Sequence, residues 1–214
     1  MSTLAEILAD PDPSVRLNAV LAAGIRPSAS DLEALVAQCA TEPDFQVREM
    51  LTWALIRQPA DLVVPRLLAE LTRPQVQARS QALHTLSKLH DGSAWPAVAA
   101  CLDDADAGVM RTAWYAAVAL VPETERVWLA EKLAASLGHG DADTQMSLSR
   151  ALVALGGEAI APILATSATH GNEATQRHVE ATRKLLEDPD YAFTRSQAHA
   201  HREVALSRTR SAKG

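Results

Sequence analysis

The clearest helical pattern in the sequence lies in residues 44–58, DFQVREMLTWALIRQ. It begins with an acidic residue, carries a Val-Arg pair shortly after it, and continues with apolar residues at helical spacing, namely Val47, Leu51, Ala54 and Leu55. Apolar residues spaced in this way predict an amphipathic helix that buries one face. The same pattern returns along most of the chain.

The recurrence has a nearly fixed period. Residues aligned on the position of Arg48 follow one another at steps of 32, 31, 32, 34 and 31, and they are Arg16, Arg48, Arg79, Arg111, Gln145 and Gln176. Each period has room for two helices, and a short helix pair buries its apolar face only against its neighbours. The sequence therefore predicts an all-α fold, a right-handed α-solenoid of about six stacked helical hairpins.

We expect this repeat array to span residues 1–189, followed by a C-terminal segment at 190–214 that is part capping helix and part disordered basic tail. Residues 194–214 hold five basic residues and one acid, a net charge of +4, so the remainder carries −6 − 4 = −10. The six repeats are predicted at 1–27, 28–58, 59–90, 91–121, 122–155 and 156–189.

Composition narrows the function classes. Hydrophobic residues make up 48% of the 214 residues and aromatic residues 4%, a mix that favours close-packed helices. The net charge of −6 disfavours a non-specific nucleic-acid binder. Cys39 and Cys101 lie in apolar helical patterns, and we interpret them as small buried side chains in a reducing compartment. Without a membrane-length apolar run or a secretory signal, the chain is expected to be cytoplasmic.

An acidic turn, a Val-Arg pair and an Ala three residues later, on a period in the low thirties, resembles HEAT-like repeats. The short repeats of bilin-lyase-type proteins are the most similar form, and the segments DPDPSVRLNAV and EPDFQVREMLTWAL carry the likeness best. It covers about residues 3–187. More loosely, residues from 44 onward are similar to HEAT-like segments attached to MerR-type regulators, although their DNA-binding domain is absent. The departures are Gln145 and Gln176 in place of Arg, and Gln75 in place of the turn acid.

The repeated arginines allow two interpretations. In HEAT-like repeats the turn acid and the Arg usually bridge neighbouring repeats, and Asp12 with Arg16 and Asp44 with Arg48 are four residues apart, the spacing of a helical ion pair. A row of ion pairs between repeats is the favoured interpretation. The alternative is a basic row that grips phosphates.

The resemblance also implies a binding surface, because the second helix of each pair lines the concave side of HEAT-like arrays. Positions one, two and five residues after the aligned Arg are expected to face it. Trp53 would be an anchor for a partner, and Arg150 would pair with a carboxylate or phosphate. The alternative for Trp53 is packing between adjacent helices. The candidate binding residues are Glu49, Trp53, Gln81, His84, Thr112, Ser147, Arg150 and His178.

No catalytic residues, metal ligands or cofactors are predicted, because no Cys/His set has zinc spacing and Ser147 lies near no obvious base. The favoured function is a non-catalytic interaction or scaffold module whose partner is another protein or peptide, with a small ligand as a further option. Nucleic acid is disfavoured for the acidic body and left open for the tail, and no membrane partner is expected. The alternatives are the sensing part of a MerR-type regulator and, least favoured, a HEAT-like lyase or DNA-repair enzyme.

Overall fold

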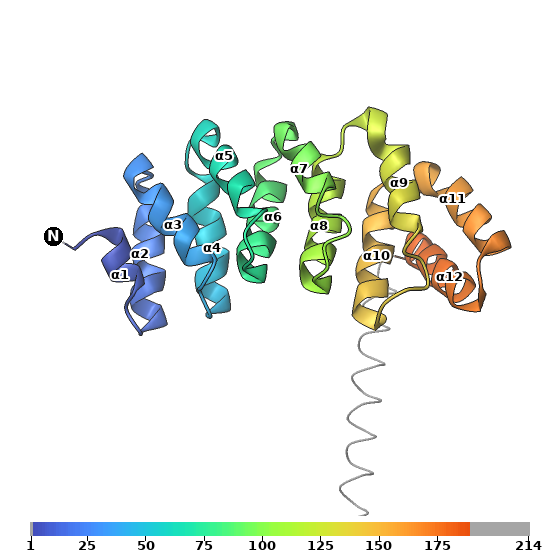
Figure 1. The fold of residues 1–214 in the computed structure, drawn as a ribbon, viewed down its shortest axis with the longest axis horizontal. Coiled ribbons are helices and arrows are strands. Elements are labelled where there is room, and N and C mark those ends of the chain that lie inside the picture. The colour runs from blue at the N-terminus through green and yellow to red at the C-terminus, as the bar shows by residue number, and fades with distance from the viewer. Residues whose placement is uncertain (1, 189–214) are drawn as a thin grey trace, which may run out of the picture. The chain divides into compact units, whose positions relative to one another are not determined.

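The computed structural model describes residues 2–188, so the predicted C-terminal segment 190–214 lies outside the described residues. The described part contains twelve α-helices and no β-strand, which confirms the predicted all-α, helical-repeat class (Figure 1). Within the same part, no helix is both long enough and apolar enough to traverse a lipid bilayer.

The described residues divide into two compact units, unit 1 up to residue 125 and unit 2 from residue 126 onward. Every hairpin consists of a first helix, a turn and a second helix. Unit 2 holds α9 (Arg126–Ala134) with α10 (Ala142–Ala154), and α11 (Gly157–His170) with α12 (Glu173–Glu187). Unit 1 holds α1 (Leu4–Leu8) with α2 (Pro13–Ile25), α3 (Leu32–Cys39) with α4 (Phe45–Ile56), α5 (Ala60–Glu70) with α6 (Val76–Leu89), and α7 (Trp95–Ala99) with α8 (Ala107–Leu120).

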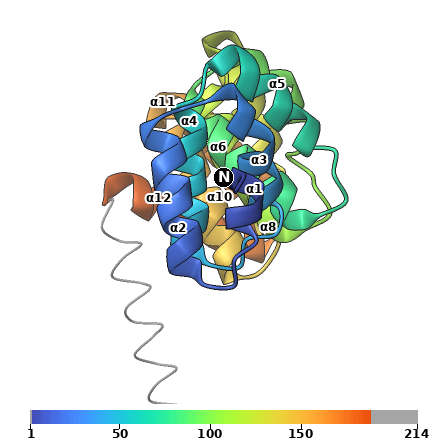
Figure 2. The same cartoon turned by 90° about the vertical axis from the view of Figure 1, so that its left-hand side faces the viewer.

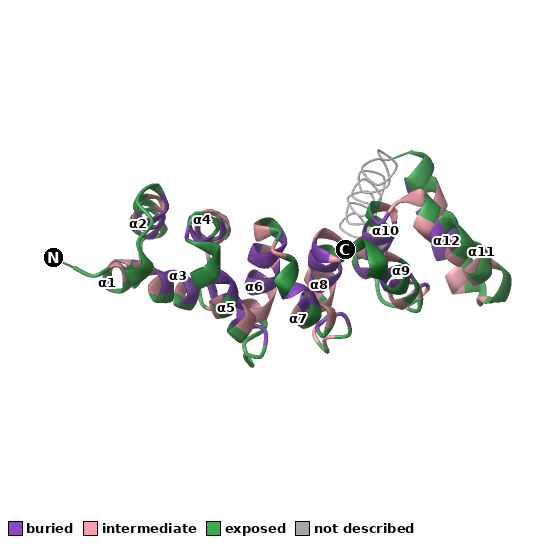
Figure 3. Cartoon of the chain, turned by 90° about the horizontal axis from the view of Figure 1, so that it is seen from above, coloured by how far each residue is buried: buried purple, intermediate pink, exposed green. Residues whose placement is uncertain are grey.

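Within unit 1 the hairpins stack side by side. Helix α2 contacts α4, α4 contacts α6 and α6 contacts α8, so the second helices form one layer. The first helices lie along the other side of this unit, as the view from above shows (Figure 3). Seen from the N-terminal end, α2 and α4 lie next to each other with α1 and α3 beside them (Figure 2). The second helices of unit 1 therefore present a common outer face.

The predicted apolar sides of the second helices form the core. Leu51 is fully buried, as its spacing predicts, and Leu86 is fully buried as well. Trp114 is also buried, and its indole N–H donates to the Leu102 carbonyl oxygen at 3.1 Å. Truncating Leu51 or Leu86 to Ala is therefore expected to cost about 2–5 kcal/mol of folding free energy.

Most second helices begin at a capping side chain that accepts a backbone N–H from the first helical turn, which satisfies one of the free donors there. In the third repeat, Gln75 holds the capping position without a side-chain hydrogen bond to the helix. The capping side chains are Asp12, Asp44, Asp106, Asp141 and Asn172.

The caps reveal that the sequence alignment is wrong by one residue in the fourth repeat. Arg48 lies four residues after its cap, Asp44, but Arg111 lies five residues after Asp106. Met110 therefore occupies the position of Arg48, and Arg111 falls one place further along the helix. The core supports this register, because the residue seven places after each cap is at most 2% exposed from the second repeat to the sixth: Leu51, Ala82, Ala113, Leu148 and Val179.

Candidate functional site

In five of the six repeats, the residue four places after the cap closes the turn that leads into its helix; the exception is Met110 in the fourth repeat, whose side chain has no donor. In Arg16, Arg48 and Arg79, Nη1 donates to the carbonyl oxygens five and six residues earlier, at 2.7–3.1 Å. Gln145 and Gln176 donate from Nε2 to the carbonyl oxygen five residues earlier, at 3.2 and 3.1 Å. The glutamines therefore preserve the turn contact that the arginines make.

Two of these arginines also bind a carboxylate of the next repeat. Arg16 donates from Nε and Nη2 to the two oxygens of Glu42, at 2.8 and 2.6 Å. Arg79 does the same with Asp104, at 2.9 and 3.0 Å. Each acid stands two residues before a cap and also accepts the backbone N–H of that capping residue. Bidentate pairs of this kind have a defined geometry and are stronger than single hydrogen bonds.

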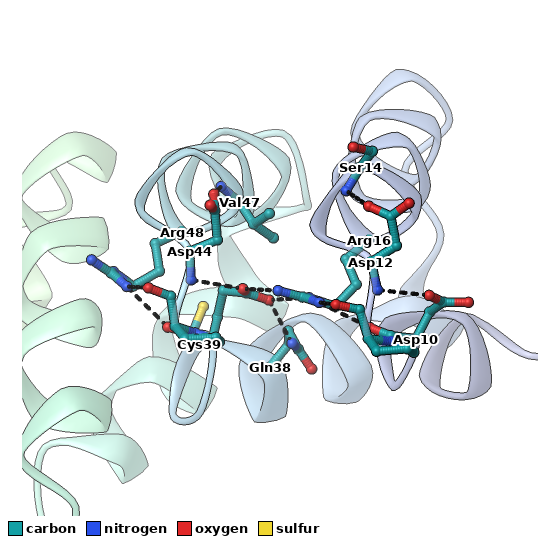
Figure 4. Close-up of polar contacts among 12 residues, drawn as sticks. Asp10, Asp12, Ser14, Arg16, Gln38, Cys39, Asp44, Val47 and Arg48 are labelled. Carbon is teal, nitrogen blue, oxygen red and sulfur yellow. Dashed lines mark hydrogen bonds and ion pairs between the residues drawn. The ribbon is translucent and has the colours of Figure 1, made fainter.

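The predicted pairs Asp12–Arg16 and Asp44–Arg48 are not the ones that form. Both aspartates are caps, and their carboxylates accept the backbone N–H groups of Ser14 and Val47. Figure 4 shows the guanidinium groups of Arg16 and Arg48 one after the other along the turns, away from the capping oxygens. The ion pair that joins repeats thus uses the earlier acid of each turn.

These contacts shift the protonation of the two acids. Burial raises the pKa of Glu42, but hydrogen bonds from Arg16, Gln38 and the Asp44 N–H outweigh it, so the pKa lies below its usual value. The hydrogen bond from Arg79 lowers the pKa of Asp104, and burial opposes it. Both carboxylates are therefore charged at neutral pH, and their chemistry is that of structural ion pairs.

Gln81, one of the candidate binding residues, does not face solvent. It is 9% exposed, and its Nε2 donates to Thr52 Oγ1 at 2.7 Å and to the Arg48 carbonyl oxygen at 3.2 Å. Gln81 lies six residues after its cap, and its side chain points toward the preceding second helix, α4. The expectation that Gln81 lies on an open surface is therefore wrong.

His178 holds the same position in unit 2 and is 3% exposed, so the same correction applies to it. Its Nε2 lies 2.9 Å from the Gln145 carbonyl oxygen and 3.0 Å from Ser149 Oγ. The Gly138 N–H donates to Nδ1 at 3.0 Å. Because Nδ1 accepts that bond, we assign the proton of the neutral ring to Nε2.

Ser149 and His178 do not form a nucleophile–base pair. A general base needs a lone pair on the nitrogen that faces the hydroxyl, and here Nε2 is the donor. The Ser149 hydroxyl can then donate to Thr182 Oγ1 at 2.8 Å, and Thr182 donates to the His178 carbonyl oxygen at 2.9 Å. This chain of hydrogen bonds joins α10 to α12. A cavity of about 280 Å³ lies beside it.

Trp53 packs between neighbouring second helices, as the alternative interpretation predicted. Its ring lies so close to Gly24 of α2 that a Cβ atom there would overlap it. The Arg57 guanidinium lies 5.0 Å from the ring centre, and Arg57 Nε donates to the Gly24 carbonyl oxygen at 2.6 Å. Glycine at position 24 is thus required by the close approach of the indole ring.

Other candidate residues lie on the outer face of α4, α6 and α8. His84 Nε2 lies 3.8 Å from a Glu49 carboxylate oxygen. Burial lowers the pKa of His84, Lys88 lowers it further and Glu49 opposes both, so the ring is neutral at pH 7. Thr112 Oγ1 lies 3.1 Å from the hydroxyl of Ser80, which joins α8 to α6.

Between α6 and α8 these side chains line a shallow groove of about 530 Å³. Tyr115 is 52% exposed beside it, with Lys88 Nζ at 3.0 Å from the phenol oxygen and 5.3 Å from the ring centre. The sequence prediction missed Arg111 and Tyr115 because of the shifted alignment. Aligning the capping aspartates would have placed both on this face. The lining residues are Ser80, His84, Gly108, Arg111, Thr112 and Tyr115.

Comparison with known proteins agrees with this repeat geometry, since residues 1–56 match the family described as HEAT repeats. The chain has a HEAT-like helical repeat fold. A search of curated proteins found no match.

Three solved structures illustrate what this HEAT-like repeat protein is similar to. An engineered protein is 21% identical, with 86% of this chain and 96% of that chain covered and a TM-score of 0.47. The complex of CpcE and CpcF of phycocyanin lyase from Nostoc sp. PCC7120 is 21% identical, with 87% and 77% covered and a TM-score of 0.49. A designed armadillo repeat protein is 16% identical, with 86% and 98% covered and a TM-score of 0.44. These likenesses are too low to transfer an activity.

The remaining candidates of the HEAT-like repeat protein lie on α10 in unit 2. Ser147 is partly exposed and Arg150 is exposed, so both side chains reach the surface of their unit. A binding role for them stays a prediction. Among residues 2–188, no cluster of three His, Cys, Asp or Glu side chains is placed to hold a metal ion.

Proposed function

We propose that this HEAT-like repeat protein is a non-catalytic interaction module that binds a segment of another protein along the groove between α6 and α8. The observation that carries the proposal is Tyr115, a half-exposed aromatic side chain that Lys88 holds beside a groove of about 530 Å³. Aromatic side chains positioned in this way supply a large contact area at low entropic cost and dominate many protein interfaces.

The charges of the groove favour an acidic partner segment. Lys88 and Arg111 place two positive charges on α6 and α8, while His84 is neutral at pH 7. The whole chain carries a net charge of −6, so this groove differs in sign from the protein around it. Complementary charges at an interface raise the association rate and select between partners.

The test uses a photo-reactive benzoyl-phenylalanine in place of Tyr115, in an extract of the source organism. The matched control carries the same amino acid at Leu62, a 41% exposed apolar residue on the first helix α5. We expect a partner to cross-link at 115 and not at 62.

The partner identified in this way is then purified and its affinity is measured directly. We expect Tyr115→Ala and Lys88→Glu each to weaken binding by about tenfold or more, as for a central aromatic or charged contact. Leu62→Ala should leave the affinity unchanged. Equal cross-linking at both positions, or full affinity in Tyr115→Ala, would overturn the proposal.

A further inference from the structure

The arginine contacts along the turns of unit 1 are interrupted at one junction. We call the Nε–H and Nη2–H groups of each guanidinium its outer edge. The outer edge of Arg16 binds Glu42 and that of Arg79 binds Asp104, each through two hydrogen bonds. Within residues 2–188, no hydrogen bond or ion pair is found on the outer edge of Arg48.

Arg48 nevertheless has the same anchoring as the two arginines that bind acids. Its Nη1 donates to the carbonyl oxygens of Glu42 and Pro43 at 3.0 and 2.7 Å, in the contact that Arg16 and Arg79 also make with their own turns. Figure 4 shows the Arg48 guanidinium extending beyond these carbonyl groups on the side away from Arg16. A guanidinium fixed in this pose presents two parallel N–H donors that match a planar carboxylate.

The sequence explains why the edge is unfilled. An acid for the Arg48 edge would have to come from the third repeat, at the position two residues before its cap. Glu42 and Asp104 occupy this position in the second and fourth repeats. In the third repeat this position is Arg73, and the cap itself is Gln75. Arg73 has no carboxylate to offer this edge, and its own Nε pairs with Glu70 at 3.4 Å.

We infer that Arg48 binds an aspartate or glutamate side chain of a partner protein, which takes the place of the missing repeat acid. A carboxylate is the ligand that the equivalent edges of Arg16 and Arg79 bind. Phe45, which is 65% exposed and has its ring centre 5.8 Å from the Arg48 guanidinium, provides an apolar border. The partner segment therefore carries an apolar residue close to its acid.

This inference names a second contact for the proposed interaction module and rests on that proposal only in requiring a protein partner. The probe is a capped pentapeptide with the sequence TEPDF, which copies residues 41–45 and so presents the chain's own edge-filling acid. It is titrated into the full chain while the side-chain Nε–Hε signals of Arg16, Arg48 and Arg79 are followed by NMR.

We expect the Arg48 signal to move saturably, while the signals of Arg16 and Arg79 stay in place because their edges are occupied. The peptide with Glu42→Gln and Asp44→Asn should bind about tenfold more weakly or not at all, since a charge-assisted bidentate pair is lost. In the full chain, Arg73→Glu should abolish the response by filling the edge from within, and Arg73→Ala should retain it.

A stationary Arg48 signal, an equal response to both peptides, or equal movement of all three arginine signals would overturn the inference. Circular dichroism of the two Arg73 variants verifies that both are folded. The groove between α6 and α8 has its own readout in the cross-link at position 115. Failure of the peptide titration is thus distinguishable from failure of the proposed interaction role.

Discussion

Three of the four turns of unit 1 and both turns of unit 2 are closed by residues in the same position, and the residue type differs between the units. Arg16, Arg48 and Arg79 stand four residues after their caps in unit 1, and Gln145 and Gln176 do so in unit 2. Both residue types donate to the carbonyl oxygen five residues earlier. The glutamine amide is shorter, and only arginine can also present a two-donor edge to an acid of the next repeat.

The comparison separates two roles that the arginine combines in unit 1, closing a turn and joining one repeat to the next. Unit 2 joins α10 to α12 through uncharged groups instead, namely His178, Ser149 and Thr182. In unit 1, Gln81 and Thr52 form a related hydrogen bond at the positions equivalent to His178 and Ser149. The ion pairs of unit 1 are therefore an addition to a polar contact that both units possess.

The largest effect is expected from Glu42→Ala, which removes the acid between the first two repeats. Arg16, Gln38 and the Asp44 N–H all lose an acceptor in a buried place, so we expect a loss of about 3 kcal/mol in unfolding free energy. Urea unfolding measures it. The control is Glu33→Ala, since Glu33 pairs with Arg66 but is 71% exposed, and it should cost less than about 1 kcal/mol. Equal costs for the two variants would contradict this.

His178→Leu and His178→Gln test whether unit 2 uses its histidine as unit 1 uses Gln81. Glutamine can donate to the Gln145 carbonyl oxygen and to Ser149, whereas leucine leaves these groups and the Gly138 N–H without their partner. We expect His178→Leu to be about 1–2 kcal/mol less stable than His178→Gln. Thermal unfolding of both variants provides the comparison, and indistinguishable stabilities would show that the histidine acts only by filling space.

Acid should weaken unit 1 through its ion pairs. The pKa values of Glu42 and Asp104 are lower in the folded chain, so their stabilisation is complete above the unfolded values and is lost as the pH falls through the folded ones. Below about pH 4.5 we expect amide exchange protection to fall faster in α2, α4 and α6 than in α10 and α12. In Glu42→Gln this extra loss should shrink, and an unchanged pH profile in that variant would refute the assignment.

The smallest change in stability is expected when an arginine–acid pair like those of unit 1 is introduced into unit 2. Position 170, two residues before the cap Asn172, is His170, so Gln145→Arg alone finds no acid and should change stability by less than about 0.5 kcal/mol. Adding His170→Glu supplies the acid and should gain about 0.5–1 kcal/mol over the single variant. Chemical unfolding of the single and double variants decides it. An equal gain in stability for the single and double variants would show that the added acid does not pair with the arginine.

The repeat period and the helix pairs could be predicted because apolar spacing and turn acids are local features of the sequence. Helix α4 runs from Phe45 to Ile56, and each end lies within two residues of the stretch 44–58 in which the sequence predicts a helix. The partner of Arg16 could not be predicted in this way, since Glu42 is 26 residues away and competes with the nearer Asp12. Arg16 pairs with Glu42 and not with Asp12 because the Asp12 carboxylate caps its helix and already accepts a backbone N–H.

The candidate surface was predicted less well, because it depends on a one-residue register. The step from Arg79 to Arg111 hid the equivalence of Arg79 with Met110, and so Tyr115 was left out of the predicted surface. Position six after the cap was expected to be open, yet it faces the preceding helix, as Gln81 and His178 show. Polar residues there satisfy one another between helices, and composition alone does not distinguish them from exposed ones.

Arg16 and Arg79, each four residues after its cap, join their repeats to the next through an acid, in addition to closing their own turns. A double-mutant cycle with Arg79→Gln and Asp104→Asn tests this role, since both substitutions can retain the turn contacts and remove only the bidentate pair. We predict a coupling energy of about 1 kcal/mol, against nearly zero for the matched cycle with Gln145→Ala and His170→Ala in unit 2. A coupling below about 0.3 kcal/mol for Arg79 and Asp104 would contradict the account.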